Sequence, residues 1–358
     1  MSCTKMRIPS NWHTFAVHHV KRNVLLSLVC ICVACYIEAK CGPVELEGPQ
    51  PLGKLYEVGG HKMHLYLTGE GNRGPAVVLE AGAGAFSIDW YLVQQEVMQF
   101  TRVCSYDRAG HAWSELGPRP RTYRQAAYDL HRLLAKAGIP APYVMVGHSM
   151  GGALVRTFVS EYPDDVVGIV LVDVGIEGSP GYVNGKVTAP WEGVQPRPIP
   201  TPRDIHEDER VLAKPELDGY KQFRELFGPP KIEPPFDRLP QPIQRLRLWA
   251  MSLPQSNVTD YNAYAAEEGF LLFADRIRHE HPLGNKPVVI LSRKSDEQER
   301  MKRQRELLNL SGNSVFSVSD FPVHEIHLAQ PDLVVEAIRT VLESIQTGGK
   351  LRLPNSAR

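Results

Sequence analysis

The sequence has no excess of charge of either sign. Lys and Arg together number 40 among 358 residues, Asp and Glu also number 40, and the formal net charge is zero. It also has no basic block and no alternation of basic and aromatic residues. Because proteins bind nucleic acid largely through clustered Lys and Arg, we predict no nucleic-acid partner. A small neutral or hydrophobic substrate is the simpler expectation.

Cysteine is scarce. Four of the six cysteines lie within the first 35 residues, which leaves Cys41 and Cys104. Beyond residue 35 the sequence has no Cys-x-x-Cys pair and no His/Cys cluster with the spacing of a metal site. We therefore predict a fold that depends on neither disulfides nor metal. Cys104 lies in an apolar run and is expected to be a buried free thiol.

The N-terminal region lacks an apolar run long enough for a typical membrane-spanning helix, which needs about 20 residues. Its uncharged run covers residues 24–37 and follows Lys21 and Arg22. This length fits the apolar region of a secretory signal, roughly 7 to 15 residues. We predict that residues 1–41 are a signal peptide or a membrane anchor. The protein is then exported (secreted or periplasmic), or associated with a membrane through this segment.

Apolar, β-branched runs alternate with helical patterns along most of the remaining chain. A Gly-Gly turn within residues 55–69 predicts a hairpin. Buried strands are predicted at 75–82, 101–107, 143–149, 166–174, 286–292 and 313–319. This alternation is typical of an α/β fold with a mostly parallel central sheet and helices on both faces.

Two helices have clear predicted starts. One begins after Thr122, which stands in capping-box spacing with Gln125, and closes at Gly138. The other begins at Pro331, in a first-turn position.

Residues 176–285 differ in composition from the rest. They contain 15 of the 29 prolines, which cannot belong to a central sheet, and two helical segments follow at 244–253 and 260–280. We predict a folded helical cap inserted after the sixth strand. The expected domains are 42–175 and 286–346 for the two parts of the core, 176–285 for the cap and 347–358 for a tail.

The motif Gly147-His148-Ser149-Met150-Gly151 stands between a predicted strand and a predicted helix. Such a sharp turn needs glycines for close approach, and it holds its central side chain exposed on a strained backbone. That arrangement suits a nucleophile.

Three further segments accompany this motif: "VVLEAGAGAFSIDW" at 77–90, "SYDRAGHAWS" at 105–114 and "VHEIHLAQPDLVVEAI" at 323–338. Together, and in this order, they resemble the α/β-hydrolase fold superfamily, in its capped serine hydrolase (esterase- or lipase-like) branch. The resemblance covers residues 55–346. It implies that Ser149 is the nucleophile and that no metal or organic cofactor takes part.

The resemblance also implies a catalytic histidine after the last strand and an acid before it. His324 stands at the family's position and is preferred to His327. Asp296, in the loop after the strand that follows the cap, is the expected acid. Glu297 and Asp173 are the two alternatives, the latter because some family members carry the acid after the preceding strand.

An acyl-transfer site further needs backbone N–H groups that stabilise an oxyanion. The resemblance assigns these donors to Met150, directly after the nucleophile, and to Ala83, in the loop after the 75–82 strand. Asp107 and Arg108 are expected to organise the loops around the site.

These features predict a serine hydrolase that cleaves a small, hydrophobic carboxylic ester through an acyl-enzyme. A serine at the motif's centre argues against the family's haloalkane dehalogenases and epoxide hydrolases, which use aspartate there. The open alternatives are hydrolysis of a lactone, a thioester or a carbon-carbon bond, and non-catalytic binding of a hydrophobic ligand.

Overall fold

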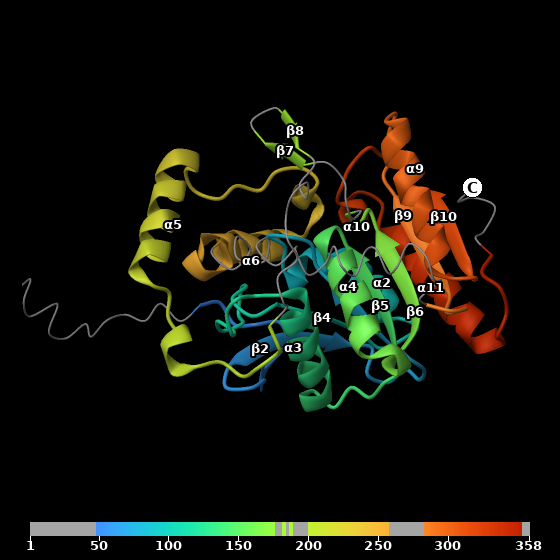
Figure 1. The fold of residues 1–358 in the computed structure, drawn as a ribbon, viewed down its shortest axis with the longest axis horizontal. Helices are drawn as coiled ribbons and strands as arrows, with labels where there is room; N and C mark the ends of the chain where they lie inside the picture. Colours follow the sequence, from blue (N-terminus) through green and yellow to red (C-terminus); the bar gives the residue numbers. More distant parts are fainter. Residues whose placement is uncertain (1–47, 176–180, 184–185, 189–199, 258–282, 353–358) are drawn as a thin grey trace, which may run out of the picture. The chain divides into compact units, whose positions relative to one another are not determined.

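The central sheet has eight strands, in the order β1-β2-β4-β3-β5-β6-β9-β10 (Figure 1). The computed structural model describes residues 48–175, 181–183, 186–188, 200–257 and 283–352. The strands are β1 (Lys54–Glu57), β2 (Lys62–Thr68), β3 (Ala76–Glu80), β4 (Val103–Tyr106), β5 (Tyr143–His148), β6 (Val166–Val172), β9 (Val288–Ser292) and β10 (Ser314–Val318). Strand β2 runs antiparallel to both of its neighbours, β1 and β4, and the pairs from β4 to β10 are parallel.

Helices cover both faces of the sheet. On one face lie α3 (Tyr123–Lys136) and α4 (Met150–Glu161), and on the other lie α2 (Tyr91–Val97) and α11 (Pro331–Thr347). Successive strand residues point to opposite faces. Val78 of β3 accordingly packs in the first apolar cluster and its neighbour Val77 in the second, both fully buried. The predicted mostly parallel α/β sheet with two covered faces is confirmed.

The predicted helix starts are also confirmed. The Thr122 hydroxyl accepts a hydrogen bond from the Gln125 N–H at 2.9 Å, and α3 begins at the next residue. Helix α11 begins at Pro331. The expected hairpin is formed by β1 and β2, with Gly59 and Gly60 at positive φ angles of 68° and 87° in its turn.

The segment between β6 and β9 holds helices of its own. They are α5 (Lys214–Phe227) and α6 (Gln241–Ser252), with short 3₁₀ turns η3 (Glu207–Glu209) and η4 (Phe236–Arg238) and a small hairpin of β7 (Gly181–Val183) and β8 (Lys186–Thr188). The predicted helix at 244–253 corresponds to α6, and the one predicted at 260–280 lies outside the described residues. Helices therefore follow the sixth strand, while the proposed domain boundaries stay predictions.

Helix α6 is tied to the core by a buried ion pair. Its Arg247 Nε lies 2.9 Å from Asp89 Oδ1 in η1 (Ser87–Trp90), and the guanidinium carbon lies 3.6 Å from the ring centre of Phe236. The remaining helical elements are η2 (Pro163–Asp165), α9 (Gln298–Glu306), η5 (Leu307–Leu310) and α10 (Ile326–Ala329).

Two further predictions concern the thiol of Cys104 and the apolar run near the N-terminus. Cys104 is a buried free cysteine in β4, as expected. The apolar run at 24–37 lies outside the described residues. Within the ranges that the structure does describe, no helix has the length and apolar character needed to cross a membrane.

Candidate active site

Ser149 occupies a sharp turn between β5 and α4. Strand β5 ends at His148 and helix α4 begins at Met150, which leaves Ser149 with φ 52° and ψ −121°. A positive φ is uncommon for a residue with a side chain and strains the backbone. Three backbone hydrogen bonds hold it there. The Ser149 N–H donates to the Val172 carbonyl at 3.1 Å, and the Ser149 carbonyl accepts from the N–H groups of Gly152 at 3.0 Å and Gly175 at 3.4 Å.

The glycines around Ser149 are required by close packing. A Cβ atom on Gly147 would lie 2.6 Å from the carbonyl oxygen of Gly151. One on Gly151 would lie 2.6 Å from the carbonyl oxygens of both Glu80 and Ala81. These contacts are with backbone atoms, which cannot easily move away. The expectation that the glycines allow close approach at the turn is confirmed.

His324 contacts Ser149 from the other end of the chain. It lies between β10 and α10, and its Nε2 is 2.9 Å from Ser149 Oγ. Its Nδ1 is 2.6 Å from Asp173 Oδ2. The structure thus forms a continuous serine-histidine-aspartate chain of hydrogen bonds, with both nitrogens of one imidazole in use.

The carboxylate in this chain is Asp173, not Asp296, so the predicted contact between Asp296 and His324 is wrong. Asp173 directly follows β6 and has a positive φ of 43°. Asp296 and Glu297 are both exposed in the loop before α9. Two groups of Arg293, at the start of this loop, bind Asp173: the backbone N–H at 3.0 Å and Nη1 at 3.2 Å. With its first residue fixed in this way, the loop presents Asp296 to solvent.

Asp173 is buried and surrounded by donors. Besides His324 and Arg293, Arg300 Nη2 of α9 contacts Oδ1 at 2.5 Å. Burial by itself would raise the pKa of Asp173. The hydrogen bonds from His324 and the Arg293 N–H, together with the positive charge of Arg300, outweigh burial and lower the pKa of Asp173 below its ordinary value. The carboxylate is therefore held ionised at neutral pH.

His327, the second candidate base, lies beneath the site. It is 2% exposed, and its ring stands 4.6 Å from the Trp90 ring and 4.4 Å from the His148 ring, measured between centres. Burial lowers the pKa of His327 well below its ordinary value. The sequence preference for His324 agrees with this geometry, since His324 is the histidine that contacts Ser149.

The loop after β3 borders Ser149. A Cβ atom on Gly82 would lie 3.2 Å from Ser149 Cβ, so this backbone passes directly beside the serine. Arg108 fixes the loop: Nη1 donates to the Ala81 carbonyl and Nη2 to the Gly82 carbonyl, each at 2.7 Å. In a trans peptide the C=O and the following N–H point in opposite directions. The N–H of half-buried Ala83 therefore points away from Arg108.

Met150 is the other residue from which an N–H donor is expected. It is the first residue of α4, and the first N–H groups of a helix have no partner within the helix. The N-terminal end of a helix also carries a partial positive charge that favours a nearby anion.

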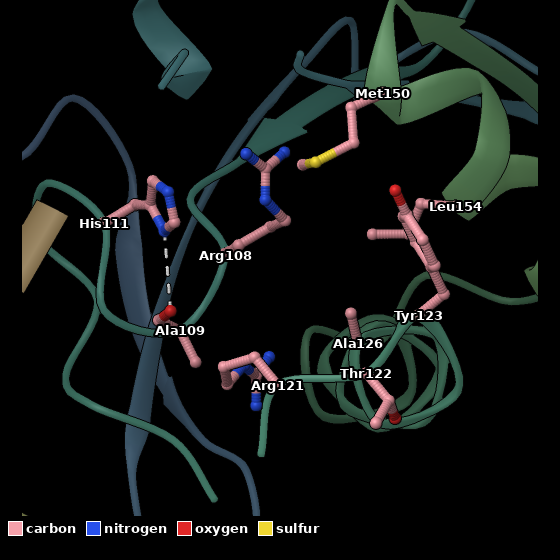
Figure 2. A pocket seen from close by; sticks show the side chains of 9 residues that line it. All are labelled: Arg108, Ala109, His111, Arg121, Thr122, Tyr123, Ala126, Met150 and Leu154. Atoms are coloured by element: carbon pink, nitrogen blue, oxygen red, sulfur yellow. Dashed lines mark hydrogen bonds between the residues drawn. The ribbon is translucent and has the colours of Figure 1, made fainter. Parts of the chain in front are cut away.

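A small cavity lies beside Met150 (Figure 2). It is bounded by the loop after β4, by the start of α3 and by the first turns of α4, and its volume is ≈ 20 Å³. Such a volume accommodates about one water molecule. Its lining residues are Arg108, Ala109, His111, Arg121, Thr122, Tyr123, Ala126, Met150 and Leu154.

Two curated proteins are similar in sequence to part of this chain. A curated "Probable transporter efuK" from Hormonema carpetanum is 32% identical over 163 residues, which are 44% of this chain and 23% of that protein. The "sn-1-specific diacylglycerol lipase ABHD11" of Mus musculus is 31% identical over 159 residues, 42% of this chain and 50% of that protein. The chain thus spans half or less of the length of these relatives.

A solved structure of a thermophilic esterase from Thermogutta terrifontis has a similar fold. Its TM-score is 0.54 at 21% sequence identity, and the match covers 80% of this chain and 94% of the esterase. The family model described as "alpha/beta hydrolase fold" matches residues 75–297, more than half of the chain. With this match and the eight-stranded sheet, the chain belongs to the α/β-hydrolase fold family.

Proposed function

We propose that the protein is a serine hydrolase that cleaves a small, hydrophobic carboxylic ester through an acyl-enzyme on Ser149. The observation that carries this proposal is the hydrogen-bonded chain from Ser149 Oγ to His324 Nε2 at 2.9 Å and from His324 Nδ1 to Asp173 at 2.6 Å. A serine hydroxyl is a weak nucleophile, and an adjacent base held by a third group is what activates it.

In the first half of the proposed reaction, His324 Nε2 takes the hydroxyl proton as Ser149 Oγ attacks the ester carbonyl carbon. The carbonyl oxygen becomes an oxyanion, which the N–H groups of Met150 and Ala83 stabilise. The tetrahedral intermediate then loses the alcohol, which leaves with the proton from His324. Ser149 remains as an acyl ester.

In the second half, a water molecule gives a proton to His324 Nε2 and attacks the acyl carbonyl. Collapse of this second intermediate releases the carboxylic acid and returns the proton to Ser149. Asp173 stays ionised throughout: it holds a proton on His324 Nδ1, which leaves Nε2 free as the base, and it stabilises the imidazolium that forms in each half.

An ester is the favoured substrate class for two reasons. The protein's relatives include a protein named as a diacylglycerol lipase, and its structural neighbours include an esterase. A serine, not an aspartate, stands at the turn, which fits acyl transfer.

The test combines a covalent probe with turnover of p-nitrophenyl esters of increasing acyl length. A fluorophosphonate should label Ser149 in the wild-type protein. Ser149→Ala should not be labelled and should lose turnover by about three orders of magnitude or more. His324→Ala should lose a similar amount, whereas His327→Ala should keep substantial activity.

Three results would contradict the proposal or narrow it. Near wild-type ester turnover by Ser149→Ala would exclude the mechanism. A wild-type protein that is neither labelled nor active would favour the non-catalytic binder. Activity limited to thioesters, lactones or carbon-carbon bonds would change the proposed substrate class and leave the proposed roles of Ser149, His324 and Asp173 unchanged.

We further propose that the apolar run at 24–37 directs the protein out of the cytoplasm or anchors it to a membrane. N-terminal sequencing of the mature protein should begin near Lys40 if a signal is cleaved. Intact Met1 in the membrane fraction would instead indicate an anchor, and intact Met1 in the soluble cytoplasmic fraction would contradict both.

A further inference from the structure

We propose that His148 is a positioning residue that fixes the backbone of His324 and lies between two loops, the loop of His324 and the loop after β3 that contains Gly82 (the oxyanion loop). This inference rests on the proposed function, because it gives His148 a part in holding the proposed base and the oxyanion loop in place. His148 directly precedes Ser149 in the sequence, and its side chain is buried.

The main contact is a hydrogen bond to the His324 backbone. His148 Nε2 lies 3.0 Å from the carbonyl oxygen of His324. A carbonyl oxygen can only accept a hydrogen bond, so Nε2 must carry the proton. The same oxygen also accepts the Ile326 N–H at 3.0 Å. Two donors therefore fix the peptide that follows the base.

His148 is suited to this role because it stays neutral. Its side chain is 4% exposed, and burial lowers the pKa of His148 to about 3. Its ring lies 4.6 Å from the His324 ring and 4.4 Å from the His327 ring, between centres. The charged groups that act on this cluster of three histidines are Asp173, which binds His324, and Arg247, whose charge lowers the pKa of His327.

His324 needs such support because it lies in a loop. Phe321 and Pro322, just before it, are exposed, and the His324 side chain itself is 35% exposed. Its imidazole must nevertheless keep contacts of 2.9 Å and 2.6 Å to two partners. Catalytic groups tolerate misplacement of only a few tenths of an ångström to about 1 Å before rates fall.

The other edge of the His148 ring borders the oxyanion loop. A Cβ atom on Gly82 would lie 3.0 Å from His148 Nδ1 and 3.2 Å from Ser149 Cβ. The ring thus fills the space between the backbone of Gly82 and the backbone of His324. A change in its shape or hydrogen bonding should disturb both loops without touching the substrate.

The experiment compares two substitutions at this position. His148→Gln keeps an amide N–H donor at about the reach of Nε2, while His148→Leu keeps bulk but loses the donor. We expect His148→Leu to lower kcat and the rate of fluorophosphonate labelling by roughly 10- to 100-fold, the effect of losing one buried hydrogen bond. KM should change little, and His148→Gln should remain within about fivefold of the wild type.

His327→Leu is the matched control. It makes the same chemical change on a neighbouring buried histidine, but outside the hydrogen bond to His324. It should keep activity close to that of the wild type, with thermal unfolding measured for all variants. If His148→Leu is as active as His327→Leu, or if His148→Gln is as impaired as His148→Leu, the positioning role is excluded.

A second measurement does not depend on turnover or on any variant folding. Nitrogen NMR of ¹⁵N-histidine-labelled protein should show His148 as a neutral Nε2–H tautomer that does not titrate between pH 5 and 8. An Nδ1–H tautomer, or titration within that range, would overturn the inference. Failure of the wild-type protein to label at Ser149 would instead count against the proposed function, so the two failures are distinguishable.

Discussion

Replacing Asp173 by asparagine tests the reaction centre most directly. Oδ1 of Asp173 accepts from the Arg293 N–H and from Arg300, and Oδ2 accepts from His324 and, at 3.2 Å, from Arg293 Nη1. In Asp173→Asn the single oxygen should stay with the backbone N–H of Arg293 and with Arg300, because the 31% exposed Arg293 side chain can turn to water. The amide NH₂ then faces His324 Nδ1. That NH₂ can only donate, so His324 must carry its proton on Nε2 and cannot act as a base. We expect kcat to fall by about 10⁴-fold.

The same substitution should cost modest stability. It removes a buried carboxylate that binds two arginines, but these side chains are 31% and 21% exposed and can regain water. The expected loss in free energy of unfolding at pH 7 is about 1–3 kcal/mol. Because the pKa of Asp173 is lowered in the folded protein, its stabilising contribution is present above the unfolded pKa of about 3.9 and is lost as pH falls through the folded pKa. The stability difference between wild type and variant should therefore shrink in acid.

Asp296→Asn is the control for this experiment. It makes the identical chemical change on an exposed side chain of the loop after β9. Ester turnover, fluorophosphonate labelling and urea unfolding measured on both variants should show a defect in Asp173→Asn alone. An active Asp173→Asn beside an inactive Asp296→Asn would refute the reasoning and return the acid to the later loop.

Two further predictions concern packing and the free thiol. Gly151→Ala should lower the free energy of unfolding by roughly 1–3 kcal/mol, because its Cβ would lie 2.6 Å from two carbonyl oxygens; an unchanged urea midpoint would contradict this. Cys104 is fully buried, and burial raises the pKa of its thiol to about 12. Iodoacetamide should therefore modify Cys104 only after unfolding. Alkylation of Cys104 in the native protein, located by mass spectrometry of its peptide, would show that β4 opens.

Most of the fold could be predicted because its elements carry local signals. The β-branched runs became the strands, Thr122 and Pro331 marked helix starts, and the glycines around Ser149 marked the turn. These signals depend on short stretches of sequence. The contact between Ser149 and His324 could be expected as well, through the order of the motifs that resemble the family.

The acid could not be chosen from the sequence in the same way. The carboxyl ends of parallel strands meet at one edge of a sheet, so Asp173 after β6 and Asp296 after β9 were both near the expected place. In the structure it is Asp173 that contacts His324. Arg293 binds Asp173 through both its backbone and its side chain, and this fixes the start of the loop that carries Asp296. The hydrogen bonds from His148 to the His324 carbonyl and from Arg108 to the Ala81 and Gly82 carbonyls likewise join segments that are distant in the sequence, so no local pattern could predict them.

The distance in sequence between the members of the reaction centre has a consequence for biosynthesis. His324 lies 175 residues from Ser149 and 151 from Asp173, and it follows β9 and β10, the last two strands at one edge of the sheet. A nascent chain that has emerged only through Asp173 carries the proposed nucleophile and acid but not the proposed base. Closing such long loops is entropically costly and typically slow. A ribosome-bound chain should therefore remain inert toward a serine-directed probe until its C-terminal fifth has emerged and docked, so that reactivity appears at the end of folding.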